Sequence, residues 1–304
     1  MSKAEKLWEV PEPLSTHDVR LDDEAVVTLR RHGNPEGPRL VMSHGNGLAI
    51  DLYYPFWSLL SDDFDLVLYD MRNHGWNDVG SIRNHNVPTL VSDHDRIVGE
   101  IDRHFGVKPR IGVFHSVSGL ISLLSPDLGS GYSALFLLDP PIYRAGDSHS
   151  HEMFEAALYR AAAMTRRRTY EFKSRAEYAD FLPHLSAFQR VLPGVCELFA
   201  ETTLREDASG KGYELRCPRE YEAKIMDYAR VFAVAVDFES FKCPVKVLGA
   251  DPTLPHSFLP AMDLSGMYGV DYDFLPDATH LLHLERPREC VDEIREFIQR
   301  VTGN

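Results

Sequence analysis

Three side chains that together can make a serine hydroxyl nucleophilic occur in this sequence in the order serine, aspartate, histidine. Ser116 lies between an apolar run that ends at Phe114 and a helical pattern. Asp251 ends a later apolar run, and His280 follows the last strand-like run, residues 270–275. A serine that passes its proton to a histidine held by a carboxylate can attack a carbonyl carbon. The sequence therefore indicates nucleophilic acyl chemistry, with Ser116 as nucleophile, Asp251 as acid and His280 as base.

Each of these assignments has an alternative. Ser116 could simply cap the following helix, which is an ordinary role for serine, and Ser118 is a rival nucleophile. Asp139 also ends an apolar run and competes with Asp251, which we favour. His283 follows His280 by three residues and is the alternative base.

The residues around Ser116 have the pattern of a strand that turns sharply into a helix. Residues 114–119 read Phe-His-Ser-Val-Ser-Gly, so phenylalanine and serine replace the two glycines of the G-x-S-x-G pattern. Such a turn directs the first N–H groups of the helix at the substrate. The loop at residues 44–47, His-Gly-Asn-Gly, can bring another N–H beside it. We therefore predict that the backbone N–H groups of Asn46 and Val117 form an oxyanion hole.

Other residues near these motifs are candidates for a pocket or for structural support. We expect His115, Leu48 and Trp57 to line the pocket, with packing as the alternative for Trp57. The segment at residues 70–75 contains an arginine and a glycine that can brace the loops below the site. The three consecutive arginines at residues 166–168 are expected to face solvent, because consecutive helical residues point in different directions.

The elements that must position these residues alternate along the chain. Short apolar runs alternate with helical patterns, which is typical of βαβ units and a parallel sheet. Helices are predicted near residues 89–105 and 287–298. Parallel strands buried on both faces read as continuous apolar runs, and such runs occur at residues 26–29, 40–42, 65–69, 110–114, 134–138 and 247–250.

The pattern changes over residues 142–241. This stretch is rich in alanine, arginine and aromatic residues, and it contains helical segments without a convincing strand. We expect it to form a helical cap inserted into one core, which residues 1–141 and 242–304 build together.

At this point the sequence resembles the α/β-hydrolase family through most of its length outside the insertion. The matching pieces are His44-Gly-Asn-Gly47, Asp70-Met-Arg-Asn-His-Gly75, His115-Ser-Val-Ser-Gly119, Gly249-Ala-Asp251, and His280 with Glu285-Arg-Pro287. The resemblance implies an α/β-hydrolase fold, with an eight-stranded, mostly parallel sheet and a helical cap inserted after the sixth strand.

The resemblance also implies a function. It points to a serine hydrolase that cleaves a carboxylic ester or related acyl compound through an acyl-enzyme on Ser116, with no cofactor. The same residues would serve a C–C bond hydrolase, amidase, lactonase, thioesterase or acyltransferase. A ligand receptor that uses the pocket without turnover is the alternative from another class.

The composition and charge of the chain exclude some classes of binding partner. The chain has 304 residues, of which 44% are hydrophobic and 26% charged, as in globular proteins. Its formal net charge of −14 would repel a phosphate backbone, so nucleic acid is not expected. No apolar run approaches the ~20 residues that span a bilayer. The amino terminus lacks the apolar stretch of a signal peptide, so we expect a cytoplasmic location and no membrane partner.

No metal site is predicted. The four cysteines, Cys196, Cys217, Cys243 and Cys290, lack paired spacing, which favours reduced thiols over a disulfide framework or a zinc site. The expected partner is a small-molecule acyl substrate, and the oligomeric state stays open, with a homodimer as one possibility.

Overall fold

An eight-stranded sheet forms the centre of the computed structural model, which describes residues 7–143, 148–233, 236–254, 264–265, 267 and 269–303, with only the backbone for 148–150. The strand order is β1-β2-β4-β3-β5-β6-β10-β11. Only the pairs β1/β2 and β2/β4 are antiparallel. The predicted mostly parallel sheet is therefore confirmed. The strands are β1 (Ser15–Arg20), β2 (Val26–Gly33), β3 (Arg39–Ser43), β4 (Asp65–Tyr69), β5 (Arg110–His115), β6 (Ala134–Leu138), β10 (Val245–Gly249) and β11 (Asp271–Phe274).

The central strands are buried on both faces. Every residue of β3, β4, β6 and β10 is buried, which explains their continuous apolar runs. Successive side chains point to opposite faces. Leu40 therefore packs in one apolar core with Ile294 of the last helix, whereas its neighbour Val41 packs in the other core with Ile101.

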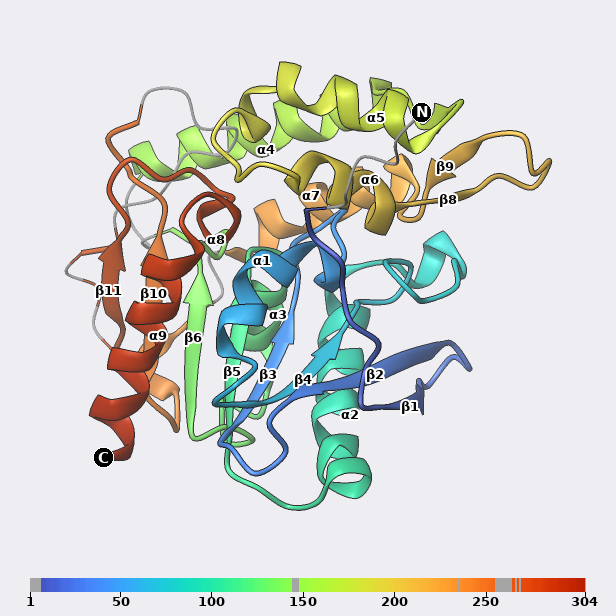
Figure 1. Ribbon diagram of the computed structural model, residues 1–304. Helices are drawn as coiled ribbons and strands as arrows, with labels where there is room; N and C mark the ends of the chain where they lie inside the picture. The colour runs from blue at the N-terminus through green and yellow to red at the C-terminus, as the bar shows by residue number, and fades with distance from the viewer. Residues whose placement is uncertain are drawn as a thin grey trace.

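Helices cover the two faces of the sheet (Figure 1). The core that contains Val41 also holds α2 (Val87–Phe105) and α3 (Val117–Leu124). The core that contains Leu40 holds α1 (Tyr54–Trp57), α8 (Leu282–Glu285) and α9 (Pro287–Thr302). The predicted helices at 89–105 and 287–298 are present. Short 3-10 helices are η1 (Ile50–Tyr53), η2 (Ser58–Leu60), η3 (Ile82–Asn84), η4 (Leu182–His184), η5 (Ser186–Phe188) and η7 (Phe238–Ser240).

The chain between β6 and β10 lies across the carboxyl ends of the central strands (Figure 1). It contains α4 (Ser148–Arg167), α5 (Arg175–Phe181), α6 (Val195–Thr203) and α7 (Arg219–Phe232). The helical insertion after the sixth strand is thus present, and we call it the cap. Its boundaries at residues 142 and 241 stay predictions.

The expectation that this segment has no strand is wrong. A small antiparallel sheet in the order β7-β9-β8 joins β7 (Glu171–Phe172), β8 (Leu204–Glu206) and β9 (Tyr213–Leu215). Two or three residues are too short for alternation to be read from a sequence.

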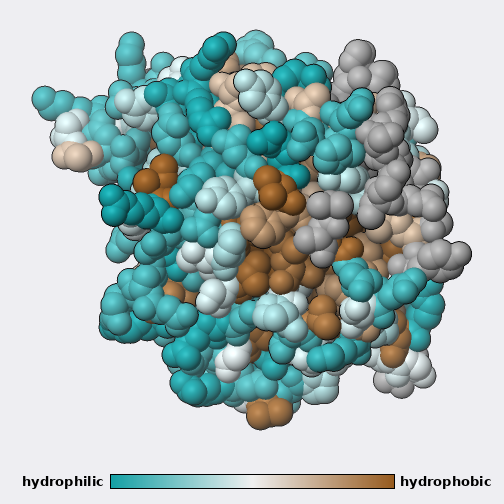
Figure 2. Space-filling view, turned by 180° about the vertical axis from the view of Figure 1, so that it is seen from behind, coloured by the Kyte–Doolittle hydropathy of each residue, from teal (hydrophilic) through white to brown (hydrophobic). Residues whose placement is uncertain are grey.

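One face of the molecule is largely polar. Figure 2 shows the face opposite to that of Figure 1, where hydrophilic residues cover most of the area and apolar side chains gather near the centre. In the part of the chain that the structure describes, no helix combines the length and apolar character needed to cross a bilayer.

Candidate active site

Ser116 sits on a sharp turn between β5 and α3. Its backbone has φ 54° and ψ −123°, which is rare for a residue with a side chain. The turn is held by the Ser116 N–H, which donates to the carbonyl of Leu138 in β6 (2.9 Å), and by the Ser116 carbonyl, which accepts from Leu120 (3.1 Å). A strained backbone held on both sides is typical of a nucleophile elbow.

The Ser116 hydroxyl contacts a histidine rather than capping α3. The Nε2 atom of His280 lies 3.0 Å from Ser116 Oγ, and the Nδ1 atom lies 2.6 Å from Oδ2 of Asp139. A carboxylate only accepts hydrogen bonds, so Nδ1 carries the proton and Nε2 is left free to accept one from the serine. The other carboxylate oxygen of Asp139 accepts from the N–H of Ala250 (3.1 Å). The three side chains form a serine–histidine–aspartate chain.

The prediction that Asp251 is the acid is wrong, because this residue's carboxylate faces another loop. Its Oδ1 accepts from the backbone N–H and hydroxyl of Thr253 (2.8 and 2.7 Å), and its Oδ2 accepts from the N–H of Asp277 (2.8 Å). These bonds, that from the Thr253 hydroxyl first, lower the pKa of Asp251. Asp251 therefore holds the loop that leads to His280 but does not touch its ring.

Strand register explains why Asp139, and not Asp251, reaches His280. Leu138 of β6 pairs with Leu248 of β10. Asp139 is one residue beyond this pair, whereas Asp251 is three residues beyond it. Both carboxylates end at the same edge of the sheet, but only Asp139 is level with His280.

The loop at residues 44–47 passes directly beside the elbow. A Cβ atom built on Gly45 would come within 2.9 Å of His115 Nδ1 and 3.2 Å of Ser116 Cβ, so the loop needs a glycine here. Val117 begins α3, where backbone N–H groups have no partner within the helix. Asn46 and Val117 line one cavity with Ser116, and the oxyanion hole at their N–H groups stays a prediction.

His115 connects the oxyanion loop to the loop of His280. The N–H of Gly45 donates to the hydroxyl of Tyr53 (2.9 Å), which lies 2.6 Å from His115 Nδ1. His115 Nε2 lies 2.9 Å from the carbonyl of His280. Since that carbonyl can only accept, Nε2 carries the proton and Nδ1 accepts from Tyr53. Burial lowers the pKa of His115 well below its usual value, so the ring stays neutral.

The alternative residues have structural roles. His283 is fully buried and packs edge-on against Tyr53, with ring centroids 4.0 Å apart, so it is not placed to act as the base. The Ser118 hydroxyl donates to the carbonyl of His115 (2.9 Å) and accepts from its N–H (3.1 Å). Neither side chain contacts Ser116 Oγ in the described structure.

A cavity of about 320 Å³ opens above Ser116 and His280, between the core and the cap. Of the three predicted pocket residues, Leu48 is part of the described wall, but His115 and Trp57 are not. His115 is used in the bridge to His280, and Trp57 is 1% exposed in the core beneath. Most of the wall is apolar and comes from the cap, including Phe172, Phe181, Phe188, Phe199, Leu158 and Met226.

One ion pair in this wall was not predicted. Arg168, just after α4, binds the carboxylate of Glu222 in α7 through both terminal nitrogens, and both residues line the cavity. Burial raises the pKa of Glu222, and the adjacent arginine opposes that effect. Arg166 behaves as expected and pairs with Asp227 at the half-exposed surface (2.5 Å). The expectation that all three arginines face solvent is therefore wrong for Arg168.

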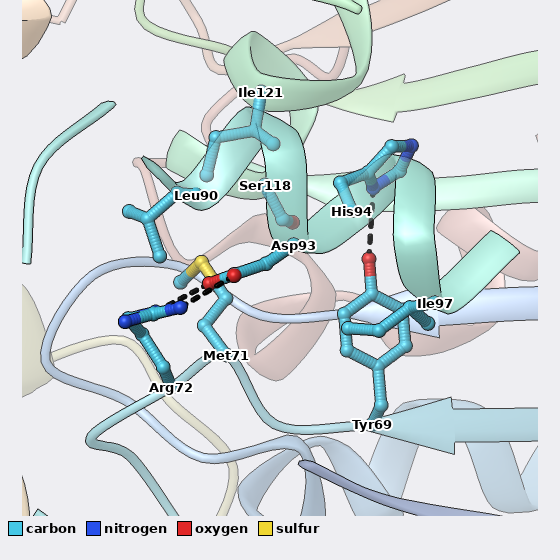
Figure 3. A pocket seen from close by; sticks show the side chains of 9 residues that line it. All are labelled: Tyr69, Met71, Arg72, Leu90, Asp93, His94, Ile97, Ser118 and Ile121. Carbon is cyan, nitrogen blue, oxygen red and sulfur yellow. Dashed lines mark hydrogen bonds and ion pairs between the residues drawn. The ribbon is translucent and has the colours of Figure 1, made fainter. Parts of the chain in front are cut away.

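The segment at residues 70–75 has the predicted structural role. Figure 3 shows a second, very small cavity behind the elbow, where Arg72 reaches Asp93 of α2 and Tyr69 reaches His94. Arg72 also pairs with Asp23 (2.7 Å). These contacts hold α2 against the loop after β4.

Among the described residues, no group of three or more histidine, cysteine, aspartate or glutamate side chains could hold a metal ion.

Comparisons with known proteins agree with this architecture. A model of the "Alpha/beta hydrolase family" matches residues 40–293. No curated protein matches the sequence. The fold is similar to E-2-(acetamidomethylene)succinate hydrolase, with a TM-score of 0.71 at 16% identity over 94% of this chain and 99% of the other.

Two further solved structures are similar. The thioesterase domain from the curacin biosynthetic pathway has a TM-score of 0.66 at 16% identity, covering 92% of this chain and 99% of that one. A thermophilic esterase from Thermogutta terrifontis has a TM-score of 0.61 at 17% identity, covering 94% and 99%. At these identities the similarity establishes the fold.

Proposed function

Because this chain belongs to the alpha/beta hydrolase family, we propose that it is a serine hydrolase that cleaves a carboxylic ester or related acyl compound. The observation that carries the proposal is the pair of distances at His280, 3.0 Å to Ser116 Oγ and 2.6 Å to Asp139 Oδ2. One imidazole thereby links the hydroxyl to a carboxylate. This arrangement lets a histidine act first as a base and then as an acid.

In the first half of the proposed reaction, Ser116 Oγ attacks the ester carbonyl and its proton passes to His280 Nε2. The carbonyl oxygen becomes an oxyanion that the N–H groups of Asn46 and Val117 would bind, a contact that contributes ~3 kcal/mol or more per donor. The bond to the leaving alcohol then breaks, and the alcohol takes the proton from Nε2. Asp139 stabilises the charged imidazole without itself taking a proton.

In the second half, a water molecule attacks the acyl-enzyme. His280 Nε2 takes a proton from the water, and a second oxyanion forms at the same position. When the bond between the acyl carbon and Ser116 Oγ breaks, Oγ takes the proton back. The carboxylic acid leaves and the free enzyme is restored, so the cycle needs no cofactor.

The proposal is tested with a fluorophosphonate probe and a p-nitrophenyl ester. We expect the probe to label Ser116, and Ser116→Ala to lose both labelling and turnover. Ser122→Ala is the matched control, since Ser122 Oγ donates to a helix carbonyl in α3, 2.8 Å away, and it should keep both. Full turnover by Ser116→Ala would refute the mechanism. A single burst without further turnover in the wild type would favour a ligand receptor.

A further inference from the structure

The wall of the cavity above Ser116 carries a charge pair that has no place in the proposed steps. We propose, as an extension that rests on the proposed function, that this enzyme is selective for uncharged, apolar acyl chains of about eight to twelve carbons. The ion pair of Arg168 and Glu222 then excludes acyl groups that end in a carboxylate.

The first argument is the charge balance of the cavity. Arg168 would be a natural partner for an anionic acyl tail, but both of its terminal nitrogens are already bound to Glu222. An incoming carboxylate would have to displace Glu222 or share Arg168 with it, at the buried Nε that has no partner in the described structure. Either outcome places two carboxylates beside one cation among apolar side chains, which is unfavourable.

The second argument is that Glu222 is held in place. A Cβ atom on Gly47 would come within 2.5 Å of the Glu222 carboxyl carbon, so this carboxyl packs tightly on the oxyanion loop. The Glu222 carbonyl accepts from the Asn46 side chain (2.8 Å). The Glu222 side chain is only 7% exposed. It cannot turn away from Arg168 unless the loop or α7 moves, so the arginine stays neutralised.

The third argument is size and surface. A cavity of about 150 Å³ is enough for benzene, so the 320 Å³ observed here holds about twelve non-hydrogen atoms. Four phenylalanines, Phe172, Phe181, Phe188 and Phe199, supply much of its wall. Burial of an alkyl chain against such a wall is favourable by ~0.8 kcal/mol per methylene.

The experiment measures kcat/KM of the wild-type enzyme for a series of p-nitrophenyl esters. From acetate to decanoate, kcat/KM should rise by about three- to fourfold per methylene while the cavity fills, and it should fall for palmitate. The p-nitrophenyl ester of octanoate should exceed the mono-p-nitrophenyl ester of octanedioate by about 100-fold or more. Equal or better turnover of the charged ester, or a maximum at acetate, would overturn the inference.

A variant tests the role assigned to the ion pair. Glu222→Gln keeps the shape but frees Arg168, so the preference for the neutral ester should shrink by about tenfold or more. Asp227→Asn is the control, because Asp227 pairs with Arg166 across the same two helices outside the cavity; it should leave the preference unchanged. A preference that is the same in Glu222→Gln and wild type would contradict the assignment.

The wild-type comparison decides the question by itself if Glu222→Gln is unstable. Failure of the proposed function is recognised separately, because then no ester is turned over and the fluorophosphonate does not label Ser116. That result would overturn both proposals. Labelling of Ser116 together with a preference for the charged ester would overturn only this one.

Discussion

Asp139 and His280 come from distant parts of the chain, yet the Asp139 carboxylate lies 2.6 Å from the imidazole Nδ1. Asp139 has a positive φ of 41°, an unusual conformation that the sheet around it must hold. Its backbone N–H donates to the carbonyl of Leu248 in β10 (3.0 Å). The end of β6 is thus fixed by its neighbour strand, and with it the position of the acid.

This contact predicts that Asp139→Asn is far more damaging than Asp251→Asn. An asparagine at 139 can donate to Nδ1 and favours the wrong tautomer, so kcat should fall by about 10,000-fold. Asp251→Asn should lower kcat by less than about tenfold, because Asp251 acts only on the loop before His280. Steady-state kinetics of both variants with one ester provide the measurement. A larger loss in Asp251→Asn would show that Asp251 is the acid.

The sequence predicted the parts of the site that lie within one continuous segment. Ser116 stands between an apolar strand and a helix, and His280 follows the last strand, so local patterns are enough to identify them. The choice between Asp139 and Asp251 depends on the register of two strands that are separated by the cap. That register is decided by tertiary packing and leaves no local signal.

The same reasoning explains what was missed in the cap. Arg168 and Glu222 are 54 residues apart, and they meet only because α4 and α7 pack together. Arg168 belongs to a run of three arginines, and no local pattern marks which of them lines the cavity. Tyr53 gave no signal either, because its hydroxyl contacts Gly45 and His115, the last residue of β5, which are distant from each other in sequence.

The bridge through Tyr53 predicts a positioning role for this residue. Tyr53→Phe leaves the Gly45 N–H and His115 Nδ1 without their partner, so both the oxyanion loop and the His280 loop should loosen. We expect kcat to fall by about tenfold with little change in KM, and the free energy of unfolding to fall by ~1–3 kcal/mol.

Two measurements separate positioning from simple destabilisation. The rate of fluorophosphonate labelling should fall in parallel with kcat at a temperature where Tyr53→Phe is fully folded. Trp57→Phe, which loses a bond to the Ile50 carbonyl (3.2 Å) in the same core, is the control; it should lose stability but keep kcat. An unchanged labelling rate in Tyr53→Phe would argue against the bridge.

Alanine is expected to lower activity at one glycine and to raise stability at another. Gly45→Ala places a methyl group within 2.9 Å of His115 Nδ1 and should lower kcat by about tenfold or more, because the loop must move away from Ser116. Gly99 lies inside α2, where a Cβ atom would meet nothing within 4 Å. Gly99→Ala should stabilise the protein by ~0.5–1 kcal/mol. Urea unfolding and ester turnover of both variants test the contrast, which fails if Gly45→Ala retains full activity.

Buried histidines predict a loss of stability in acid. Burial lowers the pKa of His94 to about 4, below its ordinary value of 6.5. Between these two values the unfolded chain binds a proton at this position and the folded protein does not. The free energy of unfolding therefore falls as the pH falls from 6.5 to 4, by up to ~1.4 kcal/mol per pH unit for this residue.

A variant can isolate that contribution. His94→Gln removes the titrating ring and should make the fall in the free energy of unfolding between pH 7 and pH 5 shallower than in the wild type. His184 is exposed, so His184→Gln is the control for the loss of an imidazole outside the core. Urea unfolding at the two pH values gives the difference directly. An equally steep fall in His94→Gln would contradict the prediction, because it would mean that the ring takes up its proton at the same pH in the folded and unfolded states.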